Sequence, residues 1–426
     1  QLQLRGGTTA EHNSFTGAAR EVTVDTTKKT LVVHDGSQAG GTPLMRESGG
    51  GVNATINGVN IGKGANSVAG NTVLGETALD ASVSGGNNTA IGKDALTALT
   101  SGASNVAVGS AALDANTTGG FNIGVGHTTL GANSTGSQNT GVGHGVLQEN
   151  TTASNNTGVG QNALQKNTTG ASNTAVGGNA LDANTTASNN TAIGQQALTD
   201  NTTGASNTAL GVLALGNNTT ADNNVAVGKH ALLNNTTGTS NVAAGTNSLY
   251  ANTTASNNTA IGYNSLLVNT TGTGNAAVGR QALDANTTGN YNVALGMNAL
   301  SANTTASNNT AVGTNALLVN TTAAENTAVG AYTLDANTTG DHNTAVGYNS
   351  LSTNISGTGN TAIGRQALRD NTTANYNTAL GRHTLLSNTE GANNVAIGSG
   401  AMDSNSTGSN NIAIGYNCLD ANTTAS

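Results

Sequence analysis

One feature of this sequence restricts its fold more than any other: Asn recurs every 17 residues from Asn71 to Asn411 without a single change of spacing. Twenty steps of 17 separate the first Asn from the last, so the unit occurs 21 times. With that Asn as position 1, the unit reads N-T-A-V-G-x-x-A-L-x-x-N-T-T-G/A-x-x. A short period without insertions means that each unit is one structural step stacked on its neighbours. The sequence therefore predicts a long, thin repeat protein.

The residues within the unit decide between helical and strand repeats. Each unit contains Asn, Thr and Gly in numbers that leave no room for a stable helix. Val or Ile at position 4 and Leu at position 9 mark two short strands, while Gly at position 5 and the N-T-T-G/A tetrapeptide supply two corners. We expect an all-β fold, a parallel β-solenoid or β-roll of 17-residue coils. Three intertwined chains in a triple β-spiral fit the same period and remain an alternative.

Stacked coils place identical residues above one another, about 4.8 Å apart, so 21 coils would extend on the order of 100 Å. We expect the Val/Ile and Leu columns to form a dry interior and the Asn columns to form amide ladders like those of cross-β structures. Representative residues of these structural columns are Asn105, Asn122, Asn139, Asn156, Leu113, Leu130, Leu147, Leu164, Gly109 and Gly126.

Three segments are expected along the chain. Residues 1–50 break the repeat rule and concentrate charge, which predicts a separate β module for attachment or trimerisation. Within it, residues 21–25 and 30–34 alternate in the manner of two strands of a hairpin. Residues 51–70 are rich in Gly and Asn and are interpreted as a lead-in coil or cap. Residues 71–426 form the array, or shaft.

The apolar content of one chain predicts self-association. Two large apolar residues per coil contribute about 4 to 6 kcal/mol of burial, against an ordering entropy above about 1 kcal/mol per residue. We therefore expect a homo-oligomer, with a homotrimer around the long axis as the leading hypothesis. Small residues at positions 3 and 8 are the expected flat contact face: Ala90, Ala95, Ala107, Ala112, Ala192 and Ala197.

Composition excludes several classes of function. The net charge of −8 is thinly spread with no Lys/Arg run, so no nucleic-acid partner is expected. No segment approaches the roughly 20 apolar residues of a membrane span, so no membrane insertion is expected. Phosphate loops, nucleophile elbows and calcium loops do not occur. We expect a protein that is not an enzyme and has no cofactor, in which Cys418 packs as an inert small residue.

Two sets of side chains are candidates for binding. His127 and His144 share one position of adjacent units, so they are weak candidates for a metal site, with solvated side chains as the alternative. Positions 6 and 17 vary most, and exposed Tyr and Arg there would suit sugars, although unconstrained outward positions would look the same. The candidate recognition residues are Tyr263, Tyr291, Tyr348, Tyr376, Arg365 and Arg382.

Two resemblances give these patterns a biological context. The N-T-A-I-G unit resembles the head repeat of trimeric autotransporter adhesins, which implies a left-handed parallel β-roll in a trimer. Residues 4–12 (LRGGTTAEH), 21–25 (EVTVD) and 29–36 (KTLVVHDG) resemble the N-terminal module of bacteriophage tail fibres. Together they imply a homotrimeric fibre of the virion. Its N-terminal end would attach to a tail or baseplate protein, and its shaft would reach toward a host-surface glycan or protein.

Two other functions remain open. A bacterial trimeric surface adhesin or extracellular filament would use the same shaft, but the expected absence of a secretory signal and a membrane anchor favours the phage fibre. Regular Thr pairs also resemble the faces of ice-binding β-solenoids. Adjacent residues of a strand face opposite sides, however, so the N-T-T order does not place both hydroxyls on one face.

Overall fold

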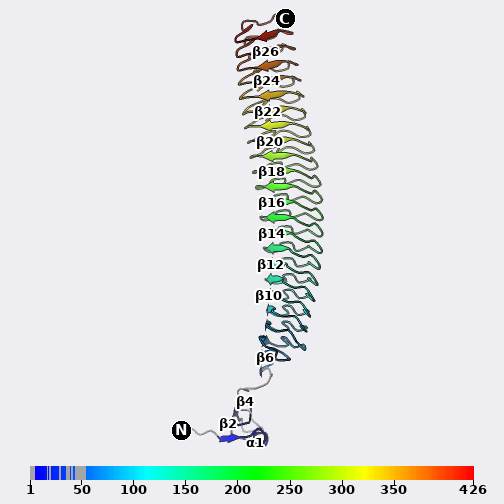
Figure 1. Ribbon diagram of the computed structural model, residues 1–426, viewed down its shortest axis with the longest axis vertical. Helices are drawn as coiled ribbons and strands as arrows, with labels where there is room; N and C mark the ends of the chain where they lie inside the picture. The colour runs from blue at the N-terminus through cyan, green and yellow to red at the C-terminus, as the bar shows by residue number, and fades with distance from the viewer. Residues whose placement is uncertain are drawn as a thin grey trace. The chain divides into compact units, whose positions relative to one another are not determined.

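The computed structural model describes residues 5–16, 18, 21–27, 30–34, 39, 42–43 and 54–426. The chain divides into two compact units, Gln1–Asn156 and Thr157–Ser426. Figure 1 labels the elements of both units.

The first unit begins with a small mixed sheet. Its strands are β1 (Arg5–Gly7), β2 (Val22–Asp25), β3 (Thr30–Val33) and β4 (Thr42–Pro43), in that order across the sheet. β2 pairs antiparallel with β3, with Asp25 opposite Thr30, so the predicted hairpin is confirmed. Lys28 and Lys29, which connect these strands, lie outside the described residues. β1 pairs parallel with β2, a contact that the sequence analysis did not predict.

A short helix, α1 (Thr9–Ser14), follows β1 and was also missed. Thr8 caps its start: the Thr8 hydroxyl accepts from the backbone N–H of Glu11, and the Glu11 carboxylate accepts from the backbone N–H of Thr8 at 2.6 Å. These hydrogen bonds to Thr8 hold the pKa of Glu11 below its usual value. The Thr-x-x-Glu spacing is a capping box, so the signal for this helix was present in the sequence.

An antiparallel hairpin precedes the repeats. β5 (Ala54–Ile56) and β6 (Val59–Gly62) are joined by Asn57 and Gly58, which both have positive φ, as a tight type I′ turn requires. β6 pairs antiparallel with β7 (Thr72–Gly75), and from β7 onward the pairing is parallel. The hairpin thus covers the open edge of the first coil, where an unpaired strand would invite association.

Each coil of the array then contributes one short strand. In the first unit these are β8 (Thr89–Ile91), β9 (Val106–Val108), β10 (Ile123–Val125) and β11 (Thr140–Val142). In the second unit they are β12 (Thr157–Val159), β13 (Thr174–Val176), β14 (Thr191–Ile193), β15 (Thr208–Leu210), β16 (Val225–Val227), β17 (Val242–Ala244), β18 (Thr259–Ile261), β19 (Ala276–Val278), β20 (Val293–Leu295), β21 (Thr310–Val312), β22 (Thr327–Val329), β23 (Thr344–Val346), β24 (Thr361–Ile363), β25 (Thr378–Leu380), β26 (Val395–Ile397) and β27 (Ile412–Ile414).

The pairing register confirms a parallel β-solenoid. Within each unit, the strands of the array pair with the strand 17 residues away in the same chain, as in Ala175 opposite Ala192 and Ala311 opposite Ala328. Figure 1 shows these strands stacked one above another in the second unit. Because the neighbouring strand comes from the same chain, the alternative of three intertwined chains is wrong.

The prediction of a second strand at positions 8 and 9 is wrong. The described coils carry consecutive turns there, and the Leu at position 9 has φ near +50°, for example +54° at Leu113 and +56° at Leu130. Position 7 also has positive φ. The N–H groups of positions 7 and 9 bond in opposite directions: Thr128 donates to Ser110 one coil earlier, and Leu130 donates to Val146 one coil later. The segment is therefore bonded to both neighbouring coils without being a strand.

The predicted orientation of the first strand is also wrong. Ala at position 3 points into the coil and is fully buried, as at Ala107 and Ala192. Val or Ile at position 4 faces solvent, with Val142 and Ile193 each 39% exposed. The interior already holds Leu from position 9 and two Asn side chains, which favours a small residue at position 3. The first coil, which has Ser82 in place of the second Asn, holds the buried Val73 there. Positions 3 and 8 are therefore core, and they cannot form the contact face between chains.

Candidate functional site

The Asn at position 1 closes each coil and joins it to the next. The backbone N–H of Asn122 donates to Oδ1 of Asn105 at 2.9 Å, and that of Asn139 donates to Oδ1 of Asn122 at 3.0 Å. Nδ2 of Asn122 donates to the carbonyl of Gly136, 14 residues later in the same coil, at 2.8 Å. Asn156 continues the ladder onto Asn139 at 3.0 Å. These side chains are fully buried. Their hydrogen bonds offset the free-energy cost of removing the amide groups from water.

The Asn at position 12 forms a second ladder that runs through side chains. Nδ2 of Asn133 donates to Oδ1 of Asn116 at 3.1 Å and also to the carbonyl of Gly136 at 3.0 Å. The second unit repeats this arrangement, as in Asn303 and Asn286 at 2.9 Å. Two polar columns therefore run through the interior beside the apolar one.

Leu and Gly complete the structural columns. The position 9 residues Leu113, Leu130, Leu147 and Leu164 are fully buried. Gly109 and Gly126, at position 5, have φ of +139° and +133°. A Cβ on Gly109 would collide with the carbonyl of Gly126, which is the same position of the next coil. Position 5 thus requires Gly for both its conformation and its space.

His127 and His144 lie where the repeat places them, on one edge of adjacent coils. Their rings stack with centroids 5.4 Å apart and planes 7° from parallel, and both side chains are exposed. Among the residues that the structure describes, no cluster of three or more His, Cys, Asp or Glu side chains could hold a metal ion.

The six candidate recognition residues separate onto two edges of the second unit. Tyr263, Tyr348, Arg365 and Arg382 share position 6, which directly follows the corner Gly. Tyr291 and Tyr376 share position 17, which directly precedes the ladder Asn. The sequence analysis grouped these residues by type, whereas the coil assigns them to opposite ends of the strand.

Thr side chains at position 13 are used inside the array. Oγ1 of Thr168 donates to the carbonyl of Thr185 at 2.9 Å, and Oγ1 of Thr202 donates to that of Thr219 at 3.0 Å. These hydroxyl hydrogens link one coil to the next, so they are not offered to solvent.

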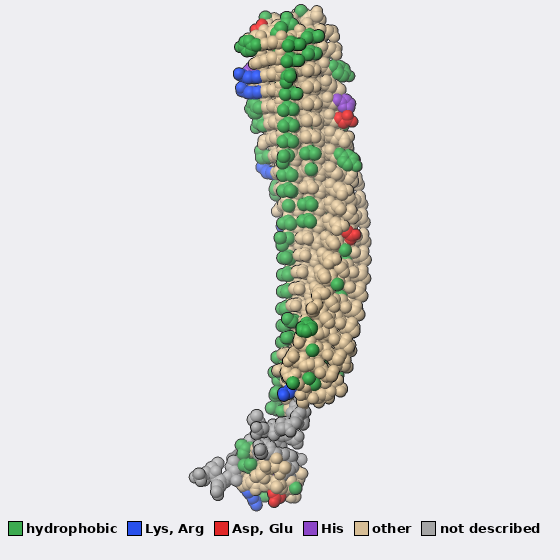
Figure 2. All heavy atoms as spheres, viewed as in Figure 1, with side chains coloured by type: hydrophobic (Ala, Val, Ile, Leu, Met, Phe, Trp, Pro, Cys, Tyr) green, Lys and Arg blue, Asp and Glu red, His purple; other side chains and the backbone are tan. Residues whose placement is uncertain are grey.

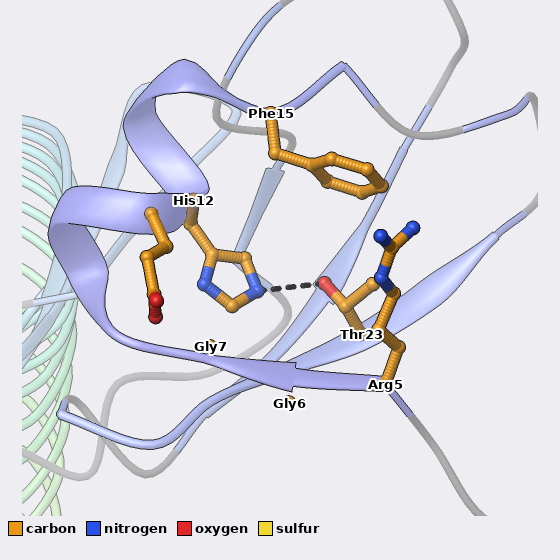
Figure 3. Close-up of a pocket in the computed structure, with 7 residues that line it drawn as sticks. Arg5, Gly6, Gly7, His12, Phe15 and Thr23 are labelled. Atoms are coloured by element: carbon orange, nitrogen blue, oxygen red, sulfur yellow. Dashed lines mark hydrogen bonds between the residues drawn. The ribbon is translucent and has the colours of Figure 1, made fainter.

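The N-terminal sheet contains a pocket of about 240 Å³, shown in Figure 3. Within it, Nδ1 of His12 lies 2.9 Å from the carbonyl of Thr8, so that nitrogen carries a hydrogen. Oγ1 of Thr23 lies 2.8 Å from Nε2 of His12 and 2.9 Å from Nε2 of His34. The single Thr23 hydrogen can be donated to only one ring, so the other ring donates to the hydroxyl oxygen.

The sequence analysis did not find this network, because His12 and His34 are isolated in the sequence. All three side chains are buried. The Arg5 guanidinium covers the Phe15 ring at 4.6 Å, and the Phe15 ring meets His34 edge-on. The network fastens α1 to β2 and to the residue after β3. Because Thr23 is 1% exposed, its hydroxyl is not an accessible nucleophile.

No helix in the described part of the chain is both long and apolar enough to cross a membrane.

The N-terminal segment of the chain is similar to known proteins. Residues 2–38 match the family model of the major tropism determinant N-terminal domain. The tail fiber receptor-binding protein of Bordetella phage BPP-1 is 71% identical over 45 residues, which cover 11% of this chain and 12% of that protein. No solved structure matches the chain significantly. The resemblance of the first fifty residues to a phage tail-fibre module is therefore confirmed for this segment, whose sheet also holds the pocket.

Proposed function

We propose that this chain is a non-enzymatic subunit of a phage tail fibre, located in the virion, which holds a rigid shaft between the phage tail and the host surface. The observation that carries the proposal is the match of residues 2–38 to an N-terminal domain found in a phage receptor-binding protein. The solenoid supports it, because a stack in which every coil is bonded to the next suits a long structural element.

The N-terminal module is the proposed attachment end. Residues 1–50 would bind a tail or baseplate protein, residues 51–70 would cap the array, and residues 71–426 would form the shaft. Immunoelectron microscopy with an antibody to the first fifty residues tests this assignment. Labelling at the end of the fibre nearest the particle is expected, and labelling scattered along free filaments would favour an adhesin or extracellular filament instead.

The proposed shaft is a homotrimer, and its contact face is the apolar outer face of the sheet. This face consists of position 4, which carries Val, Ile, Leu or Ala in every coil. Figure 2 shows it as a column of hydrophobic side chains. In the second unit the most exposed members are Val159, Ile193, Leu210, Val227, Ile261, Leu295, Ile363, Leu380 and Ile414.

The size of this face argues for a second copy of the same chain as its occupant. Nine of its sixteen residues in the second unit are 36 to 66% exposed, and the other seven are less exposed. Together they leave on the order of 1,000 Å² of apolar surface, compared with roughly 800 Å² per partner in stable complexes. Such a continuous patch exceeds what monomers usually expose. A parallel copy would repeat the same 17-residue spacing, so that each apolar residue meets another at every coil.

A further inference from the structure

Position 17 forms an outward edge of the second unit with an unusual backbone. Tyr291 and Tyr376 have φ of +56° and +54°, a left-handed conformation that is rare for bulky residues. Their side chains are 67% and 64% exposed. Solvent therefore reaches most of each ring, although the backbone that carries it is hydrogen bonded to the coil before, from Tyr291 N–H to Thr273 O at 3.0 Å.

Each Tyr is paired with a Gly at the same position one coil earlier. A Cβ on Gly274 would lie 2.7 Å from Cδ1 of Tyr291, and a Cβ on Gly359 would lie 2.8 Å from Cδ1 of Tyr376. Most other coils carry Asn or Ser at this position with the same positive φ, so the backbone does not demand Gly there. The glycines instead leave the space that the rings occupy. Each ring is thereby held against the coil beneath it.

A polar group accompanies each ring in the same way. Oδ1 of Asn290 accepts from the backbone N–H of Thr273 at 2.8 Å, and Oδ1 of Asn375 accepts from that of Thr358 at 2.7 Å. Fixing the oxygen also fixes the direction of the amide nitrogen, which is a hydrogen-bond donor. An exposed aromatic ring beside an oriented amide is thus repeated twice on this edge.

A polar pair lies between the two rings on the same edge. Glu325 and His342 are in adjacent coils at position 17, with Oε2 of Glu325 3.1 Å from Nδ1 of His342. Both side chains are more than half exposed. The 85 residues from Tyr291 to Tyr376 make five coils, so the rings are about 24 Å apart at 4.8 Å per coil. The tyrosine edge consists of four residues, Tyr291, Glu325, His342 and Tyr376.

We propose that the tyrosine edge binds a linear glycan that lies along the stack. Sugar rings present C–H groups that pack on exposed aromatic faces, and their hydroxyls bond to amides and carboxylates. Two such platforms separated by several sugar residues suit an extended chain. Each contact alone is weak, and the two add through their fixed spacing. The inference rests on the proposed function, because a host-surface polysaccharide is what such a fibre would meet.

The experiment is affinity electrophoresis of the full chain in native gels that contain dextran, mannan or galactan. We expect at least one of these neutral glycans to retard the wild-type chain. Y291A/Y376A should weaken that binding by roughly tenfold, since both stacking platforms are removed. The matched control Y263A, which removes an exposed Tyr from the position 6 edge, should bind like the wild type. Circular dichroism verifies that each variant is folded.

A second double variant tests whether the position of the two rings against the coil is required, and not merely the presence of Tyr. G274N/G359N keeps both tyrosines and uses a residue that other coils carry at this position with the same φ, as at Asn257 and Asn308. Its side chains would displace the rings, so binding should fall as in Y291A/Y376A. Unchanged binding of G274N/G359N, equal loss in Y263A, or no retardation by any of the three glycans would overturn the proposal.

Virion adsorption distinguishes this proposal from the fibre assignment. If phage carrying Y291A/Y376A adsorb normally while an antibody to the first fifty residues still labels the particle-proximal end, the fibre stands and the glycan edge falls. Adsorption that depends on a host protein, shown by its loss when the cells are treated with protease, would also overturn the glycan edge. Scattered antibody labelling would instead remove the fibre assignment while leaving glycan retardation measurable.

Discussion

At the scale of single residues, the array depends on side chains whose polarity or backbone conformation is unfavourable alone. Leu in a left-handed conformation costs about 1 kcal/mol or more, yet it recurs in nearly every coil. Complete burial of its side chain offsets that cost. The buried Asn residues are likewise tolerated because the neighbouring coil satisfies them. These residues are therefore stable only when the coil is stacked on its neighbours.

The position 1 Asn should be among the most sensitive residues. Asn292→Ala removes the acceptor for the backbone N–H of Asn309 (3.0 Å) and the donor to the carbonyl of Ala306 (2.8 Å). The buried N–H of Asn309 is left unpaired, whereas the carbonyl of Ala306 keeps a donor in Nδ2 of Asn303 at 3.1 Å. The free energy of local opening should therefore fall by about 1 to 3 kcal/mol. Native-state hydrogen exchange of the flanking coils measures this. Thr305→Ala, at an exposed position of the corner that follows Asn292 in the same coil, is the control and should change it by less than about 0.5 kcal/mol.

Three carboxyl groups at position 10 predict an unusual dependence of stability on pH. Burial raises the pKa of Asp114, Asp284 and Asp335 above the usual 3.8. The folded state then holds protons more tightly than the unfolded state, so their stabilising effect is complete below the unfolded pKa. It is lost as the pH rises through the folded pKa. The array should melt at a higher temperature at pH 4 than at pH 7, as followed by circular dichroism.

The triple variant D114N/D284N/D335N tests the cause of that dependence. Because Asn does not titrate, the difference in melting temperature between pH 4 and pH 7 should shrink relative to the wild type. A difference that persists unchanged would assign the effect to other groups.

At the scale of the element, each coil combines one strand with turns whose geometry only Gly permits at position 5. Gly296 has φ of +139°, and a Cβ there would collide with the carbonyl of Gly313 in the next coil. This residue was identifiable from the sequence as a corner. No other residue can replace it because the backbone of the next coil leaves no space for a side chain. The sequence alone does not show that contact.

Gly296→Ala should therefore open the stack locally. We expect a loss of about 3 kcal/mol or more, because backbone strain and a steric clash coincide. Limited proteolysis should cut near the altered coil. Gly178→Ala is the matched control, since a Cβ on Gly178 meets nothing within 4 Å. Equal resistance of both variants to protease would contradict the role assigned to position 5.

At the scale of the whole molecule, the outer apolar face is a surface through which a chain with a narrow interior would gain further burial. Its position 4 residues are mostly Val, Ile and Leu, which a globular protein would place inside. Association of copies through this face would remove them from water. The homotrimer is proposed for the same reason as in the sequence analysis, which is the small apolar burial within a single chain. The residues proposed for the contact are different.

Charges on this face should separate the chains without unfolding them. Ile261→Lys with Leu295→Lys places two ammonium groups in the proposed contact, where each copy would meet the same charges on its neighbours. Sedimentation velocity should show a shift from trimer to monomer. Val268→Lys with Val319→Lys is the control, because these side chains have similar exposure away from position 4. A wild-type chain that sediments as a folded monomer would refute the homotrimer itself.

The sequence alone determined the period, the absence of helical repeats, the corner glycines and the Asn columns. Each of these follows from residue identity at a fixed spacing. The tertiary structure decided which side of the strand faces inward, because a three-residue Thr-Ala-Val strand can present either Ala or Val to the core. Hydrophobicity favours Val, but the volume left beside Leu and two Asn side chains favours a small residue such as Ala. The available volume depends on all the side chains of the closed coil, so it cannot be derived from any single position of the sequence.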